Sequence, residues 1–241
     1  MPEGHEYICF GEAEAVGPWK VMPGKDCGNP IRSSRYYKIN CPFESSVYVD
    51  ATKLHLLKEP FFSISEEILN TYDDKMFCLE HPHRHSYLNE MMEYYNNGWW
   101  SKNEIMQYTA LLKDNGFDFK KFFSPLCTIL WRKLTDEIKE FNKVWYNWGN
   151  LNYNRDNIPF DAAIQMTGMT PSFYDDRNES GIALGFFNKV GRRKKHPQHG
   201  DKKQYLRKNE LMENLQDITG MHSKFYDTYN HEFYMKYFDI I

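Results

Sequence analysis

The chain has 241 residues, of which 41% are hydrophobic, 26% charged and 17% aromatic, and its formal net charge is −3. These values are typical of a globular α/β protein, and we expect a single domain over residues 1–241. The slightly acidic balance argues against a dedicated nucleic-acid-binding protein, because such proteins are usually strongly basic.

The sequence carries no membrane or export signal that we recognise. It has no run of about 18 apolar residues, and its first residues lack a basic segment followed by an apolar one. The five cysteines are widely spaced and form no Cys-x-x-Cys pair, which fits neither a zinc cage nor a disulfide framework. We therefore expect a soluble, cytoplasmic protein without a transmembrane segment.

Short apolar runs alternate along the chain with helical patterns. Strands are predicted at 6–10, 46–50, 75–80, 127–131 and 181–187. A Ser followed by Glu three residues later predicts helix starts at Ser63 and at Ser101, and Gly116 is placed to end the second of these helices. Further helices are predicted over 134–148 and 211–218. This alternation predicts an α/β fold with a mostly parallel sheet and helices on both faces.

The first candidate site lies at the end of the strand 46–50. That strand delivers Asp50 to its carboxyl end, where ligands of open α/β sheets bind. A carboxylate there can hold Mg²⁺ or Mn²⁺ beside a diphosphate, or it can simply cap a turn. Many nucleotide-sugar enzymes have a second acid two residues later. Here that residue is Thr52, a weaker metal ligand, so the dependence on metal stays open.

The second candidate is a histidine-rich junction between a strand and a helix. It contains His81, His83, Arg84 and His85. His83 and Arg84 can bind a sugar or a phosphate, the histidines can cap the helix that follows, or they can hold a metal. We rank binding of sugar or phosphate first and a metal last, because residues two apart converge only on an extended backbone.

The third candidate is an acidic residue at a predicted helix start. Asp156 precedes Asn157 and Pro159, which is the pattern of an N-cap with proline in the first turn. A carboxylate held there suits recognition of sugar hydroxyls or general-base catalysis. Upstream of the Asp50 strand, a set of basic residues can bind phosphates or be ordinary surface charge; it consists of Arg32, Arg35 and Lys38.

Six short motifs in order resemble the GT-A-type glycosyltransferase-like family of plants, algae, bacteria and large viruses, first catalogued as a domain of unknown function. They are Tyr-Ile-Cys-Phe at 7–10, Gly-Pro-Trp-Lys-Val at 17–21, Arg-Ser-Ser-Arg-Tyr-Tyr-Lys-Ile at 32–39, Val-Tyr-Val-Asp at 47–50, His-Pro-His-Arg at 81–84 and Arg-Asp-Asn-Ile-Pro-Phe at 155–160. The resemblance covers roughly residues 5 to 170. The family usually has Gln where this chain has Asn157.

The resemblance implies a GT-A-like fold and a transferase that moves a sugar from a nucleotide diphosphate to a glycan or another hydroxyl acceptor. Asp50 would hold Mn²⁺ or Mg²⁺, or the donor itself, and Asp156 would act as general base or contact the acceptor. The residues implied in donor binding are Arg35, Lys38, Asp50, Thr52, His83, Arg84 and Arg155. Plant members are associated with cell-wall and mucilage polysaccharide.

Two alternatives to a glycosyltransferase are compatible with the sequence. One branch of the family has been described as an alkaline ceramidase, which implies a metal-dependent lipid amide hydrolase with His81, His83 and His85 as metal ligands. The family also usually begins with a further strand, Tyr-Thr-Ala-Ile-Phe-Gly-Gly-Tyr, which this chain lacks. We therefore expect either the strand 6–10 to have moved beside 46–50 or additional residues upstream. A non-catalytic glycan-binding remnant is the third reading.

Overall fold

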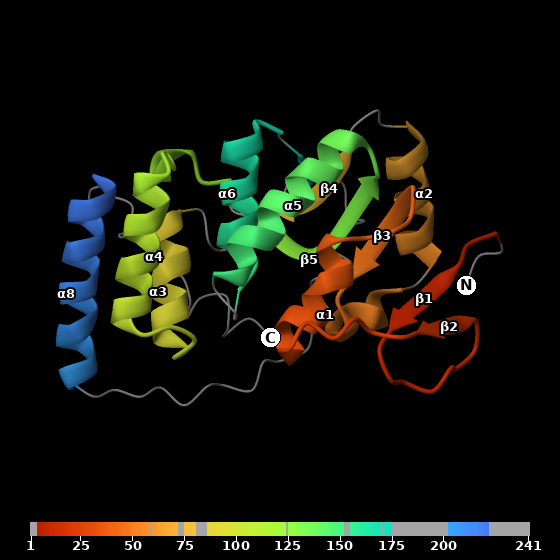
Figure 1. The fold of residues 1–241 in the computed structure, drawn as a ribbon, viewed down its shortest axis with the longest axis horizontal. Coiled ribbons are helices and arrows are strands. Elements are labelled where there is room, and N and C mark those ends of the chain that lie inside the picture. Colours follow the sequence, from red (N-terminus) through yellow and green to blue (C-terminus); the bar gives the residue numbers. More distant parts are fainter. Residues whose placement is uncertain are drawn as a thin grey trace. The chain divides into compact units, whose positions relative to one another are not determined.

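The computed structural model describes residues 4–57, 59–71, 75–80, 86–123, 125–151, 155–169, 171–174 and 202–221 (Figure 1). The chain divides into two compact units. The first contains the strands β1 to β6 with the helices α1, α2, α5 and α6, and the second contains α3, α4 and α8. The predicted strand at 181–187 lies outside the described residues.

The larger sheet of the first unit is built around one buried strand. β5 (Pro125–Lys133) pairs antiparallel with β3 (Ser45–Val49) on one side and with β4 (Met76–Glu80) on the other. β4 also pairs in parallel with the short strand β6 (Ser172–Tyr174). The chain is therefore mixed α/β, as predicted, but the expectation of a mostly parallel sheet is wrong. Apolar runs predict where strands lie, whereas strand direction depends on how the connections return the chain.

Alternating side chains of β5 pack on opposite faces of this sheet. Ile129 and Trp131 belong to one apolar cluster with residues of α2 (Glu59–Thr71), including Phe61 and Ile68. On the other face, Arg132 reaches α1 (Pro30–Ile39). Because α2 and α1 cover different faces, both faces of the sheet are buried, which explains why β5 reads as an almost continuous apolar run.

A second, smaller sheet joins β1 (Tyr7–Phe10) and β2 (Trp19–Met22) in parallel. The sequence did not predict β2. Tyr7 pairs with Trp19 and Phe10 with Met22, so the first of the two expected alternatives, pairing of residues 6–10 with residues 46–50, does not occur. The Phe10 ring of β1 stacks on the Tyr37 ring of α1, with ring centroids 3.7 Å apart. Aromatic stacking therefore attaches the small sheet to α1 rather than to the edge of β3.

Two further helices of the first unit follow the central strand β5 in the chain. α5 (Asp136–Asn150) and α6 (Asn157–Thr167) pack against each other. The rings of Trp145 and Phe160 meet edge to face at 4.8 Å, and both side chains are fully buried. Gly168, at a positive φ of 71°, ends α6 in the left-handed conformation that glycine adopts easily. The short 3₁₀ helix η1 (Ala51–Leu56) follows Asp50.

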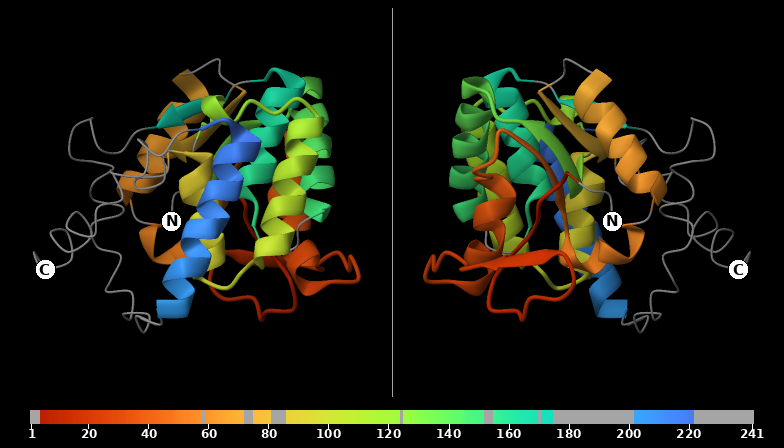
Figure 2. Two further views of the ribbon diagram at one scale, coloured as in Figure 1. Left: turned by 90° about the vertical axis from the view of Figure 1, so that its left-hand side faces the viewer. Right: turned by 90° about the vertical axis from the view of Figure 1, so that its right-hand side faces the viewer.

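The second unit is a set of helices that pack on one another: α3 (Tyr87–Asn96), α4 (Lys102–Asp114) and α8 (Lys202–Thr219) (Figure 2). The 3₁₀ helix η2 (Phe119–Lys121) also belongs to it. The predicted capping box of Ser101 and Glu104 is confirmed at the start of α4. The one predicted at Ser63 is wrong, because α2 already begins at Glu59 and Ser63 lies inside it.

Candidate functional site

Helix α1 carries the three basic residues that the sequence analysis selected, Arg32, Arg35 and Lys38. Asn29 caps it by accepting hydrogen bonds from the backbone N–H groups of Ile31 and Arg32, and Pro30 occupies the first turn. Residues three apart on a helix lie on neighbouring parts of its surface, so Arg32, Arg35 and Lys38 project in related directions. The sequence analysis did not predict this helix, although Asn29 and Pro30 are a recognisable start signal.

Lys38 lies at the centre of the candidate site. Its ammonium group is paired with the carboxylate of Asp156, and its Nζ is also 3.5 Å from Oδ1 of Asp50. The Lys38 side chain is only 6% exposed, whereas Asp156 is 16% and Asp50 28% exposed. Two carboxylates from distant segments thus share one buried cation, and Asp50 is the more accessible of the two.

Tyr48 fixes the orientation of Asp50. The Tyr48 hydroxyl donates a hydrogen bond of 2.6 Å to Oδ1 of Asp50, the same oxygen that faces Lys38. The two residues are neighbours on the same side of the strand because side chains alternate along β3. Asp50 precedes η1 but its side chain caps no helix, so the turn-capping reading of this residue is wrong.

Asp156 is held by α5 as well as by Lys38. Its backbone carbonyl accepts hydrogen bonds from Nε1 of Trp145, at 3.1 Å, and from the N–H of Phe160, at 3.0 Å. The residue stands at the N-cap position of α6, as predicted, but its side chain makes no capping hydrogen bond. The carboxylate binds Lys38 instead, because a buried ammonium is a stronger partner than a backbone N–H group.

Electrostatic coupling keeps this cluster charged. Burial alone raises the pKa of Asp156, but Lys38, with further help from Arg35 and Arg155, reverses that effect and leaves the pKa below its usual range. For Lys38, burial lowers the pKa, but Asp156 and Asp50 outweigh it, so the pKa is raised. Burial, Asp50 and its hydrogen bond also raise the pKa of Tyr48, against an opposing effect of Lys38. Lys38 and Asp156 are therefore an ion pair at neutral pH, and Tyr48 keeps its proton.

Arg132 supports the end of the helix that carries Lys38. Its Nη1 donates hydrogen bonds to the carbonyl oxygens of Lys38, at 2.6 Å, and of Ile39, at 3.1 Å. These carbonyls belong to the last turn of α1, which carries partial negative charge and has no further helical N–H partners. A buried arginine from the central strand thus fixes the backbone from which Lys38 extends.

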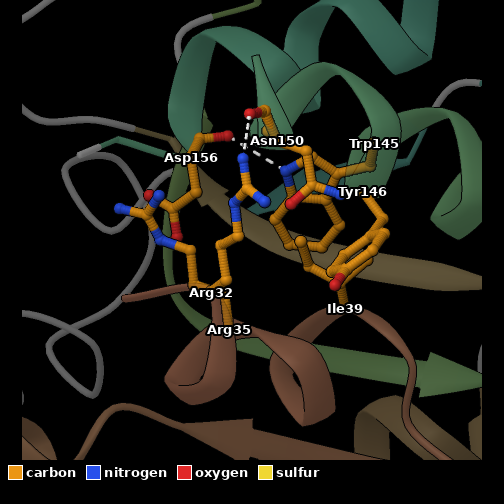
Figure 3. A pocket seen from close by; sticks show the side chains of 8 residues that line it. Arg32, Arg35, Ile39, Trp145, Tyr146, Asn150 and Asp156 are labelled. Carbon is orange, nitrogen blue, oxygen red and sulfur yellow. Dashed lines mark hydrogen bonds between the residues drawn. The ribbon is translucent and has the colours of Figure 1, made fainter. Parts of the chain in front are cut away.

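Beside the cluster lies a small depression lined by both charged and aromatic side chains (Figure 3). Its empty volume, open solvent included, is about 270 Å³. Arg32 and Arg35 rise into it from α1, and Nη2 of Arg32 donates a hydrogen bond of 3.1 Å to the carbonyl oxygen of Asn150. The complete lining is Arg32, Arg35, Ile39, Trp145, Tyr146, Gly149, Asn150 and Asp156.

The structure brings part of the predicted site together. Asp50, Asp156 and Lys38 are in contact, and Arg35 and Arg155 act on the charge of Asp156. Thr52 lies in η1, two residues after Asp50. His83 and Arg84 fall outside the described residues, as do His81 and His85. The convergence of Arg84 on this site therefore stays a prediction.

The sequence analysis missed three members of this neighbourhood: Tyr48, Arg132 and Tyr146. Tyr48 lies two residues before Asp50 in a strand, and this spacing alone could have placed both side chains on one face. For Arg132 the signal was a charged residue within an apolar run, which usually has a buried partner. Nothing in the sequence indicates that Tyr146 would line the depression.

No group of three or more His, Cys, Asp or Glu side chains that could hold a metal ion occurs among the residues with described positions. In the same part of the chain, no helix is both long and apolar enough to span a bilayer. Comparisons of the chain with family models, with curated proteins and with solved structures find no match.

Proposed function

We propose that this protein is a glycosyltransferase that uses a nucleotide-diphosphate sugar, with its donor site at the Asp50–Lys38–Asp156 cluster and the adjoining depression. One observation carries the proposal: Asp50 and Asp156 both contact the Lys38 ammonium, and the surface beside them is lined by arginines. The motifs around these residues, at 32–39, 47–50 and 155–160, are among those that resemble the glycosyltransferase-like family.

The charge of the depression favours an anionic ligand. Arg32 and Arg35 line it, and the only carboxylate in that lining, Asp156, is already neutralised by Lys38. Guanidinium groups bind phosphate oxygens through two parallel N–H donors, so an arginine pair suits a diphosphate. The volume of about 270 Å³ includes open solvent, so the depression is shallow and does not enclose a ligand. A diphosphate would lie over it against the arginines, while sugar and base extend beyond it.

The two carboxylates would have different roles. Both contacts of the Asp50 carboxylate use Oδ1, and the side chain is 28% exposed, so Oδ2 is the natural group to meet a sugar hydroxyl or a metal ion. Asp156 is a poor general base, because its pKa is lowered and Lys38 occupies it. We therefore assign it to positioning: it holds Lys38 and orients the Arg155 segment.

A divalent cation fits this arrangement without a protein cage. Mg²⁺ is commonly held by one or two carboxylates together with substrate phosphates, so Asp50 alone could provide the protein ligand. Mn²⁺ or Mg²⁺ would supply neutralisation of the leaving diphosphate. The arginines would contribute to the same charge stabilisation through fixed donors.

Calorimetric titration with uridine and guanosine diphosphates, with and without Mn²⁺, tests this function. We expect Arg35→Ala to weaken binding at least tenfold, about 1.4 kcal/mol. The matched control is Lys113→Ala, which removes an exposed cation on α4 and should leave affinity unchanged. Equal affinities in the two variants, or no binding of any nucleoside diphosphate by the wild type, would contradict the proposal.

Turnover separates an enzyme from a binding remnant. Incubation with nucleotide sugars should release the nucleoside diphosphate, and Asp50→Asn should abolish that release while the fold is kept. Binding without release, across donors and a panel of glycan acceptors, would identify a non-catalytic glycan-binding protein instead.

A further inference from the structure

Cys41 lies against a buried cation that lacks hydrogen-bond partners for part of its guanidinium group. Arg132 is only 2% exposed, and its Nε and Nη2 make no hydrogen bond with any residue that the structure describes. Its Nη1 donates hydrogen bonds to the carbonyls of Lys38 and Ile39. Buried donors without acceptors are unfavourable, so an oxygen atom placed beside them would be bound well.

The register of the sheet brings Cys41 to these donors. Arg132 pairs directly with Ser46 across β3 and β5, so the two side chains stand next to each other on one face. Sγ of Cys41 is 3.2 Å from Oγ of Ser46. Cys41 also acts on the charge of Arg132 through hydrogen bonding and attraction, although burial is the larger effect and lowers the pKa of Arg132 overall. Nε and Nη2 still have no acceptor within hydrogen-bonding distance among the described residues.

Cys41 differs from the other cysteines because it is partly exposed and also lies beside a buried arginine. Cys78 and Cys127 are buried, whereas Cys9, Cys27 and Cys41 are partly exposed. Among the contacts that the structure describes for the partly exposed cysteines, only Cys41 is placed beside an arginine; Cys27, for example, accepts a hydrogen bond from Tyr146 at 3.6 Å. Reactive cysteines are those that are accessible and lie beside a cation. Cys27 also lies near a cation, the exposed Lys25, but the cation beside Cys41 is buried and has donors without acceptors.

From this geometry we infer that Cys41 is a site of oxidation by hydrogen peroxide, at which Arg132 binds the oxygen of the resulting sulfenic acid. Sγ attacks one peroxide oxygen, an S–O bond forms and the O–O bond breaks. The sulfur is oxidised by two electrons, and the second oxygen leaves as hydroxide, which takes up the thiol proton to become water. The new oxygen lies within reach of Nε and Nη2, while Nη1 keeps its bonds to α1.

The experiment exposes the intact chain to hydrogen peroxide with dimedone, which bonds covalently to sulfenic sulfur. Mass spectrometry of the peptides then follows the labelling rate of each cysteine. We expect Cys41 to be labelled at least fivefold faster than Cys9 and Cys27 in the folded protein, and all five cysteines to be labelled at similar rates in urea. Equal labelling of the three partly exposed cysteines in the folded state would overturn the proposal.

Two variants test the part played by Arg132. Arg132→Lys keeps a positive charge but loses Nε and Nη2, and we expect the Cys41 rate to fall to that of Cys9. Ser46→Ala removes the neighbouring hydroxyl and keeps the arginine, so it should retain the preference for Cys41. If circular dichroism shows that Arg132→Lys does not fold, the labelling rates of folded and urea-unfolded wild type still decide whether the fold makes Cys41 reactive. An unchanged rate in folded Arg132→Lys would refute the role of the arginine.

Discussion

The Lys38 ammonium on α1 is ion-paired with the Asp156 carboxylate at the start of α6, and the lysine side chain is almost completely buried. This pair connects the early and late parts of the first unit. It also places Asp156 near Asp50, which faces the same ammonium at 3.5 Å. Removing either partner leaves a buried charge with a weaker neighbour, so stability should report on the pair directly.

Asp156→Asn should therefore destabilise the protein at neutral pH by about 3 kcal/mol, because breaking a buried ion pair leaves an uncompensated charge and Asp50 compensates only in part. Chemical denaturation measures this loss. The pKa of Asp156 is lowered in the folded state, so its contribution is present above the unfolded value, near 4, and is lost as pH falls below it. The difference between wild type and variant should shrink below about pH 4; a difference independent of pH would contradict the pairing.

Asp50→Asn should have a small effect on folding and a large effect on activity. The amide oxygen can still accept the Tyr48 hydrogen bond, and the contact with Lys38 is long, so we expect a loss of about 1 kcal/mol or less. Release of nucleoside diphosphate should fall below detection, since the proposed donor site would lose the charge that is to face the donor. Asp114→Asn, an exposed change at the end of α4, is the control. Unfolding of Asp50→Asn would assign the residue to structure alone.

Tyr48→Phe should separate orientation of Asp50 from its charge. The variant loses the 2.6 Å hydrogen bond and leaves the ring in place, with an expected destabilisation of about 1 kcal/mol. We expect turnover to drop severalfold, with smaller changes in donor affinity, because the carboxylate remains but is less well oriented. Tyr37→Phe, whose ring stacks on Phe10, provides the comparison and should keep full turnover. Equal losses in both variants would argue against a positioning role for Tyr48.

Two serines with the same sequence pattern should respond differently to alanine. Ser101→Ala removes the N-cap of α4, where Ser101 and Glu104 exchange hydrogen bonds, and should destabilise by about 1 kcal/mol. Ser63→Ala changes an exposed residue inside α2, where no helix cap is lost, and should destabilise by less than Ser101→Ala. Thermal unfolding of the two variants measures the contrast, and equal effects would show that the cap contributes little.

The difference between these serines shows how far local signals reach. Ser101 and Ser63 both precede Glu by three residues, but only the first begins a helix, because α2 starts at Glu59. The sequence predicted the strands β1, β3, β4 and β5 from their apolar runs, and it missed β2, β6 and helix α1. The missed strands are short, and α1 has a mixed surface rather than one apolar stripe.

The sequence by itself determined the mixed α/β class, the cap of α4, the apolar identity of β5 and the acidic and basic residues worth testing. These features depend on residues a few positions apart, which interact in the same way wherever the segment lies. Only the tertiary structure decided that β5 runs antiparallel to both neighbours, that Lys38 is buried between Asp50 and Asp156, and that Arg132 supports α1. Such contacts join segments that are remote in the chain. They become strong only after the core has folded and excluded water around them.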